Sequence, residues 1–225
     1  MRPEIHLVSQ GDMNLESLLA IAAGVHPFVD FIHLREKRIT AKELLRLVEE
    51  MAEHGVPLGK MIVNDRLDVA LASGAGGVQL AGHSLPASAA RRIAPGIRLG
   101  CSVHSPEEAA LAAREGADFC LYGHVYASAS KPGLPARGMG GLQAAVRACP
   151  APVIAIGGIG PELAGEVLRT GAAGFAVLSG ICGAEDPVSA ARAYREAAEA
   201  AMKGEAAEAA MKEITEGGVG VEGGN

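Results

Sequence analysis

Tryptophan is absent from this chain of 225 residues, and aromatic residues make up only 3% of it. Aliphatic residues must therefore fill the core, and a hydrophobic content of 49% is enough for a sizeable one. No hydrophobic run approaches the roughly 20 residues that a membrane-spanning helix needs. The N-terminus also lacks the hydrophobic region of a signal peptide. These absences predict a cytoplasmic protein with no membrane partner.

Basic residues are not in excess, since 20 Lys and Arg stand against 26 Asp and Glu and give a formal net charge of -6. An extended nucleic-acid interface needs clustered basic residues, so we expect no nucleic-acid partner. The four cysteines, Cys101, Cys120, Cys149 and Cys182, contain no Cys-x-x-Cys spacing. The absence of this motif, together with the wide separation of the four residues, predicts reduced thiols that fill apolar space and not a disulfide framework.

Short hydrophobic segments alternate with helix-like segments along the chain, and they are apolar on both faces, as parallel strands covered on two sides should be. The predicted strands are Glu4–Ser9, Val29–Arg35, Lys60–Asn64, Gly77–Leu80, Arg98–His104, Asp118–Gly123, Pro152–Gly157 and Gly174–Ser179. Eight β/α units in about 200 residues are typical of a single-domain (β/α)8 TIM barrel. An open doubly wound sheet usually carries a glycine fingerprint after its first strand, and none is present here.

Helix starts are marked by capping residues. Thr40 followed by Glu43 forms a capping-box pattern. Ser105 and Asp186 each precede a proline at the first helical position.

The C-terminus is of low complexity, because the sequence EAAEAAMK occurs at residues 196–203 and again at 205–212, on either side of Gly204. Glycine disfavours helix by roughly 1 kcal/mol relative to alanine. We therefore predict a barrel over residues 1–202 and a helical or flexible extension over residues 203–225.

Polar residues gather where the predicted strands end, which is the face on which barrel active sites are built. The residues predicted there are Arg35, Lys37, Asn64, Asp65, Ser102, His104, His124 and Lys131. Together they indicate a basic, hydrogen-bonding mouth above an apolar barrel.

Glycines follow the last two predicted strands, in the turns that begin with Gly157-Gly158-Ile159 and Ser179-Gly180. Glycine lets a backbone approach a phosphate closely, and exposed amides at helix starts bind oxyanions. Because many barrels hold phosphate after strands seven and eight, these turns predict a phosphorylated small-molecule ligand.

His124 lies at the end of the sixth strand, directly after Gly123. Its imidazole suits proton transfer, since the unperturbed pKa of histidine lies near neutrality. On the residue alone, a structural histidine is the more frequent alternative.

Several motifs resemble thiamine phosphate synthase in order and spacing, over about Glu4 to Tyr194. They are His33-Leu34-Arg35-Glu36-Lys37, Val63-Asn64-Asp65-Arg66-Leu67-Asp68-Val69-Ala70, Gly77-Val78-Gln79-Leu80, Gly100-Cys101-Ser102-Val103-His104 and Ala155-Ile156-Gly157-Gly158-Ile159. The resemblance implies a single-domain barrel, a thiazole phosphate site near the glycines and a homodimer.

Two departures favour a paralogous branch of that superfamily. A synthase usually carries an acid near Ser84 that helps Asp65 hold Mg²⁺, and a Pro-Thr-x-Thr-Lys loop after the sixth strand. This chain instead has Gly123-His124-Val125-Tyr126 followed by Lys131, which is similar to the thiazole tautomerases of thiamine biosynthesis (TenI-type).

That similarity implies an isomerase that converts a dihydrothiazole carboxylate phosphate to the aromatic thiazole without a cofactor or metal. His124 would move the proton, with His104 as the rival base. Arg35 and Lys37 would pair with the carboxylate, and Asn64 and Ser102 would line the site. The alternatives are thiamine phosphate synthase itself, which couples a pyrimidine pyrophosphate to a thiazole phosphate with Mg²⁺, and a non-catalytic thiazole-phosphate sensor.

Overall fold

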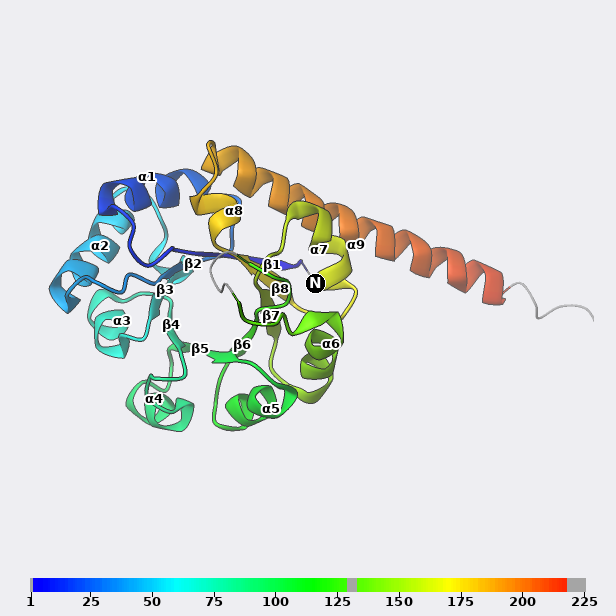
Figure 1. Cartoon of the computed structure of the whole chain (residues 1–225), viewed down its shortest axis with the longest axis horizontal. Coiled ribbons are helices and arrows are strands. Elements are labelled where there is room, and N and C mark those ends of the chain that lie inside the picture. Colours follow the sequence, from blue (N-terminus) through cyan, green and yellow to red (C-terminus); the bar gives the residue numbers. More distant parts are fainter. Residues whose placement is uncertain (1, 129–132, 218–225) are drawn as a thin grey trace, which may run out of the picture.

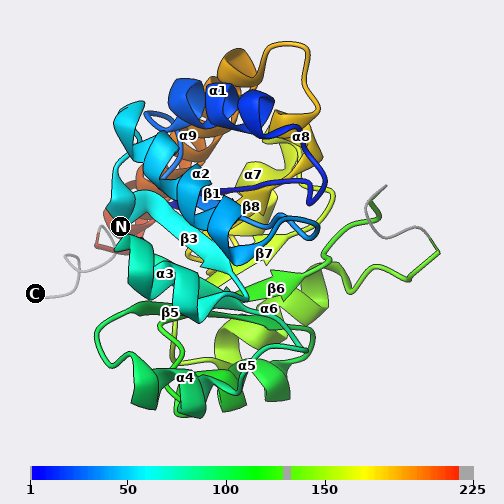
Figure 2. The same cartoon turned by 90° about the vertical axis from the view of Figure 1, so that its left-hand side faces the viewer.

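The chain folds into a closed barrel of parallel strands in sequential order, each followed by a helical connection (Figures 1 and 2). The computed structural model describes residues 2–128 and 133–217, with side chains described up to Gly204. The predicted (β/α)8 barrel is therefore confirmed. Lys131, which was predicted to lie at the barrel mouth among the substrate-binding residues, lies outside the described residues.

The strands agree with the predicted ones to within one or two residues at each end. They are β1 (Glu4–Val8), β2 (Phe31–Leu34), β3 (Met61–Asn64), β4 (Gly77–Leu80), β5 (Arg98–Val103), β6 (Phe119–Gly123), β7 (Val153–Ile156) and β8 (Gly174–Val177). Ser9, Arg35, His104 and Ser179 lie just beyond the strands in which they were predicted. This places Ser9, Arg35 and His104 in loops at the barrel mouth and Ser179 at the start of the helix that follows β8.

Helices surround the barrel, and most begin at the mouth because each returns antiparallel to its strand. They are α1 (Leu15–Val25), α2 (Ala41–Glu53), α3 (Leu67–Ser73), α4 (Ala87–Ile93), α5 (Pro106–Arg114), α6 (Gly138–Ala148), α7 (Ala164–Leu168), α8 (Ser179–Cys182) and α9 (Pro187–Gly217). Short 3-10 turns occur at Leu58–Lys60 and Pro161–Leu163.

The predicted caps are present. The Thr40 side chain accepts a hydrogen bond from the Glu43 amide, and the Glu43 carboxylate accepts one from the Thr40 amide. Ser105 caps α5 through the Glu108 amide. The Asp186 carboxylate accepts hydrogen bonds from the first turn of α9.

Two apolar clusters form the core, as expected for strands that are covered on both faces. The smaller cluster joins side chains of β1, β6, β7 and β8, namely Val8, Phe119, Leu121, Ile154 and Ala176. The larger cluster joins the strands to the surrounding helices and is dominated by aliphatic residues. The chain thus builds its core largely without aromatic residues.

A buried polar chain runs between the first strands. His6 Nδ1 lies 2.8 Å from His33 Nε2, and His6 Nε2 lies 3.0 Å from Glu4 Oε2. The Arg98 guanidinium donates to Glu4 and lies 5.1 Å from the centre of the Phe119 ring. Burial lowers the pKa of His6, and it lowers the pKa of His33 well below the ordinary value of 6.5.

This histidine pair predicts acid sensitivity. The unfolded chain binds protons at about pH 6.5 that the folded chain rejects, so stability is lost as the pH falls below that value. Urea unfolding between pH 7.5 and 5.5 should show a loss of up to about 1.4 kcal/mol per pH unit for each histidine. His33→Gln should flatten this slope, whereas His54→Gln, at an exposed helix end, should not. An unchanged slope in His33→Gln would contradict this account.

Helix α9 begins against the barrel and continues past it (Figure 1). Its side chains Ala191, Tyr194 and Ala198 are buried. The α9 backbone is helical through Gly204 without interruption. The predicted boundary between the barrel (residues 1–202) and the C-terminal extension (residues 203–225) remains a prediction. Residues 218–225 lie outside the described part of the chain. Among the residues that the structure describes, no helix is long and apolar enough to cross a membrane.

Candidate functional site

The β2–α2 loop carries the cationic side of the barrel mouth. The Arg35 amide donates to Ser9 Oγ at 2.8 Å, and the Lys37 amide donates to the Gly11 carbonyl at 3.0 Å. Gly11 has a φ of 102°, and a Cβ there would lie 3.1 Å from Arg35 Nη1. The β1–α1 loop therefore fixes the half-buried Arg35 and leaves Lys37 exposed.

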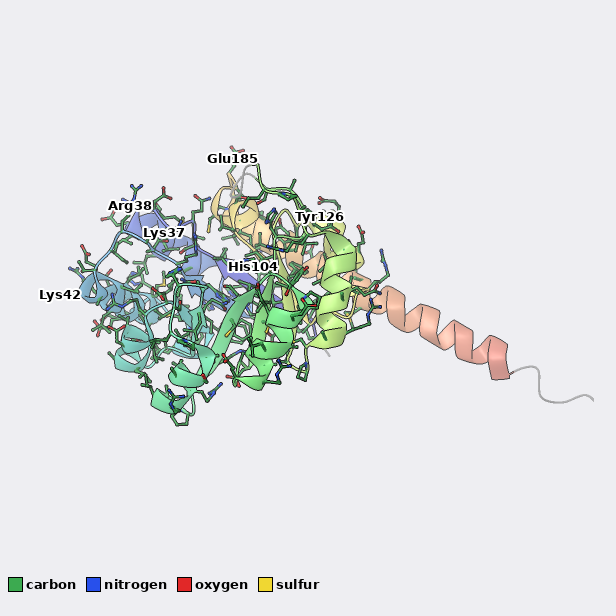
Figure 3. All side chains as sticks on the ribbon, turned by 60° about the horizontal axis from the view of Figure 1, so that its bottom comes forward. Lys37, Arg38, Lys42, His104, Tyr126 and Glu185 are labelled. Atoms are coloured by element: carbon green, nitrogen blue, oxygen red, sulfur yellow. The ribbon has the colours of Figure 1, made fainter. Side chains whose placement is uncertain are left out.

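Additional cations flank this loop, and Figure 3 shows Lys37, Arg38 and Lys42 on one side of the molecule, away from Tyr126. Arg38 is exposed, and Lys42 lies in the first turn of α2. The carboxylate of the neighbouring Glu43 already caps this helix start, so the positive charge on this side of the mouth comes mainly from Arg35, Lys37 and Arg38. The arrangement attracts anions to this side of the mouth.

Strands β3 to β5 contribute a neutral polar group. Asn64 and Gln79 are register partners, and Gln79 Nε2 donates to Ser102 Oγ at 3.0 Å. Gln79 is only 1% exposed and its Oε1 has no partner among the described residues. Gly100 leaves room for it, since a Cβ there would lie 2.3 Å from that oxygen. The structure thus brings the predicted Asn64 and Ser102 to one edge and adds Gln79.

Asp65 follows β3 in a left-handed conformation with a φ of 67°. Its amide donates to the Gln79 carbonyl at 2.8 Å, and its Oδ1 accepts a hydrogen bond of 2.5 Å from Ser84 Oγ. His83 Nε2 lies 3.6 Å from Oδ2. Within the described ranges, no group of three His, Cys, Asp or Glu side chains is arranged to hold a metal ion. Asp65 therefore places a partly exposed carboxylate beside the neutral groups of β3 to β5.

The glycines after β7 let two loops approach closely. Gly157 and Gly158 have φ values of 109° and 67°. The Val125 and Tyr126 amides donate to the Ile156 and Gly157 carbonyls, at 2.9 and 3.0 Å. The loop after β6 therefore runs alongside the end of β7. These contacts explain the glycines sterically, independently of any phosphate.

Amides at the same end of the barrel remain available to a ligand. Ser179 and Gly180 are exposed and begin α8, so their amides have no partner within the helix. The Tyr194 hydroxyl donates to the Ile159 carbonyl at 3.0 Å. A Cβ at Gly180 would lie 2.2 Å from the Tyr194 hydroxyl oxygen, so only glycine fits there. Tyr194 of α9 thus joins the β7 and β8 turns, a role that its distance along the sequence concealed.

His124 lies beside the glycine turn but not in open space. His124 is 5% exposed, and a Cβ added at Gly157 would lie 2.4 Å from the Cβ of His124. Its Nε2 is 3.3 Å from the Leu134 carbonyl, within the same β6–α6 connection that stands out from the barrel in Figure 2. The rival His104 is more exposed and lies 3.3 Å from Glu108 through Nδ1. The geometry therefore gives His124 a loop-fixing contact.

Comparison with known proteins identifies the family. The family model described as "Thiamine monophosphate synthase" matches residues 5–181. The thiamine-phosphate synthases of Albidiferax ferrireducens and Methanoculleus marisnigri are 39% and 41% identical over 80% and 81% of this chain, and over 84% and 86% of their own lengths. The thiamine phosphate pyrophosphorylase from Pyrococcus furiosus has a TM-score of 0.76 at 32% identity, covering 89% of this chain and 97% of that one.

These findings correct the predicted activity. The chain was expected to be an isomerase of the thiazole tautomerase type, yet the relatives with about 40% identity over most of its length are thiamine-phosphate synthases, which are transferases. The similarity to the tautomerases lies in the short segment after β6, whereas the synthase motifs extend over the barrel. The alternative drawn from the sequence, the synthase, is the one that the relatives support. The chain belongs to the thiamine monophosphate synthase family.

Proposed function

We propose that this protein is a thiamine-phosphate synthase. In this reaction the ring nitrogen of a thiazole phosphate attacks the methylene carbon of a pyrimidine pyrophosphate. A carbon–nitrogen bond forms, the carbon–oxygen bond to pyrophosphate breaks, and pyrophosphate leaves with the bonding electrons. The observation that carries the proposal is that the barrel mouth has two different sides. Arg35 and Lys37 form a cationic side, and the amides of Ser179 and Gly180 form the other, so each phosphorylated substrate has its own binding side.

The cationic side suits the leaving group. Arg35 is fixed by the β1–α1 loop, and Lys37 is exposed beside it. Pyrophosphate gains negative charge as the carbon–oxygen bond breaks, and positioned cations stabilise that charge most in the transition state. The two residues predicted to bind a substrate carboxylate are thereby reassigned to the pyrophosphate.

Asp65 fits a Mg²⁺ ion that is shared with the substrate. Magnesium is commonly bound by one or two carboxylates together with substrate phosphates, so a complete cage of protein ligands is not required. The Asp65 side chain is 37% exposed at the mouth, and Ser84 holds one of its oxygens. Bound there, the ion would help to neutralise the charge of the pyrophosphate.

The amide side suits the phosphate of the thiazole. Gly158, Ile159, Ser179 and Gly180 place backbone donors at the β7 and β8 turns, where barrels frequently bind phosphate. Asn64 and Ser102 lie between the two sides and can bind the polar edges of the reacting rings. The homodimer implied by the resemblance remains a prediction.

His124→Ala should retain thiamine phosphate formation to within about tenfold of the wild-type kcat/KM. The coupling needs no proton shuttle, and the variant loses one hydrogen bond, to the Leu134 carbonyl. Steady-state kinetics with both substrates and Mg²⁺ would measure this. A loss of 10³-fold with an unchanged fold would instead make the imidazole catalytic.

The proposed function is tested by incubating the protein with the pyrimidine pyrophosphate, the thiazole phosphate and Mg²⁺ and following the product by mass spectrometry. A synthase forms thiamine phosphate over many turnovers, whereas a sensor binds the thiazole phosphate and forms no product. Binding without turnover would therefore refute the proposal.

A further inference from the structure

Two cysteine thiols meet in the layer between the barrel and its helices. Cys120 lies in β6, and Cys149 follows the end of α6. Their sulfurs are 3.7 Å apart, and both point to the Ala109 carbonyl of α5, at 3.7 Å from Cys120 and 3.3 Å from Cys149. Both thiols are free and buried, with Cys149 8% exposed.

We propose that Cys120 and Cys149 form a disulfide when the folded protein meets a small peroxide oxidant. A disulfide has a sulfur–sulfur distance of about 2.05 Å, so the two sulfurs, now 3.7 Å apart, must approach each other by roughly 1.6 Å. The proposal is independent of the coupling reaction. It concerns a pair of thiols that the proposed mechanism does not use.

The chemistry requires only the two thiols and hydrogen peroxide. One thiol gives up its proton and attacks a peroxide oxygen, the oxygen–oxygen bond breaks, and the departing hydroxide takes up that proton, so a sulfenic acid and water are formed. The second thiolate then attacks that sulfur, the sulfur–oxygen bond breaks, and the hydroxide leaves as a second water after protonation. The two sulfurs are oxidised, and the peroxide is reduced to two molecules of water.

Burial makes the reaction slow and selective for small oxidants. It raises the pKa of the Cys120 thiol, with a further contribution from the neighbouring Cys149. Cys101 and Cys182 are also held as thiols, since burial raises their pKa values to about 11 and about 12. Proximity of the second sulfur therefore distinguishes the Cys120–Cys149 pair, because the sulfenic acid is captured as soon as it forms.

The disulfide would join the two ends of the β6–α6 unit. Its cysteines are 29 residues apart, and the segment between them includes the loop that contacts the β7 glycines. Cross-linking restricts the unfolded chain, so the oxidised protein should melt at a temperature roughly 5–10 °C higher than the reduced protein.

The test treats the full-length native protein with hydrogen peroxide and maps its peptides without reduction. We expect one cross-linked peptide pair containing Cys120 and Cys149, two hydrogen atoms lighter than the separate thiols, together with the rise in melting temperature. Cys149→Ser should abolish both effects. Cys182→Ser, which removes a thiol that donates to the Val8 carbonyl rather than to another sulfur, should abolish neither.

Other outcomes would overturn the proposal. A cross-link of Cys120 to Cys101, its register partner on β5, would assign the pairing to the strands. A cross-link that forms only in denaturant would show that the native contact does not cause it. Prolonged oxidation of the native protein without any cross-link would show that the sulfurs cannot close the remaining distance.

Discussion

Arg35→Ala should lower kcat/KM for thiamine phosphate formation by about 10²–10³-fold, the loss usual for one positioned donor to a developing negative charge. Arg35 is half-buried, its backbone amide donates to Ser9 Oγ, and its guanidinium lies 3.5 Å from the Gln10 carbonyl of the β1–α1 loop, so the side chain is held at the mouth. Steady-state kinetics and circular dichroism on the variant would separate the loss of activity from a loss of fold.

Two further variants define this effect. Arg38→Ala removes an equal charge from an exposed neighbour on the same loop and should reduce kcat/KM only slightly, because solvent screens that charge. Arg35→Lys should recover little, because an ammonium cannot reproduce the planar fork of the guanidinium. Equal losses in Arg35→Ala and Arg38→Ala would reduce the role of Arg35 to general attraction.

Gly158→Ala should cost about 10²-fold in kcat/KM and about 1–3 kcal/mol in the free energy of unfolding. The residue has a φ of 67°, which alanine adopts at a cost, and its Cβ would lie 2.5 Å from the Ala127 carbonyl oxygen. The β6–α6 loop and the amides of the β7 turn would have to separate. Affinity for the thiazole phosphate, measured by calorimetry, should fall together with activity.

Gly82→Ala is the matched control for this substitution. Gly82 lies in an exposed loop at the same mouth, and a Cβ there would meet nothing within 4 Å. Its activity and stability should stay close to wild type. If Gly158→Ala behaved in the same way, the β7 turn would not hold the phosphate through a fixed backbone.

The barrel was predictable because its determinants are local. Strand burial on both faces, the Thr40 capping box and the start of α5 at Pro106 each follow from a few neighbouring residues, and all are present. Deviations are confined to strand ends such as Ser9 and Arg35, where the chain leaves the sheet and periodicity gives no boundary.

The contacts within the site were less predictable because they join distant parts of the chain. Tyr194 reaches the Ile159 carbonyl across 35 positions, and Ser84 reaches Asp65 across 19. Gln79 offered one usable signal, since an amide in an otherwise apolar strand needs a polar partner. Neither strand patterns nor turn signals identify such pairs.

The error in the predicted activity has a similar cause. A histidine after a glycine suits proton transfer, but its role depends on what surrounds the ring. In the structure the His124 ring is buried and contacts the Leu134 carbonyl. The motif around His124 therefore reflects the structure of the β6–α6 loop, whereas the motifs spread over several strands indicate the family.

The central claim is that one mouth binds two phosphorylated substrates and joins them. Phosphorus NMR of a mixture of the protein, Mg²⁺, the pyrimidine pyrophosphate and the thiazole phosphate tests it most directly. We expect free pyrophosphate and thiamine phosphate to appear together in equal amounts, and Arg35→Ala to slow the appearance of both. Pyrophosphate released without thiamine phosphate, or no change in either substrate, would contradict it.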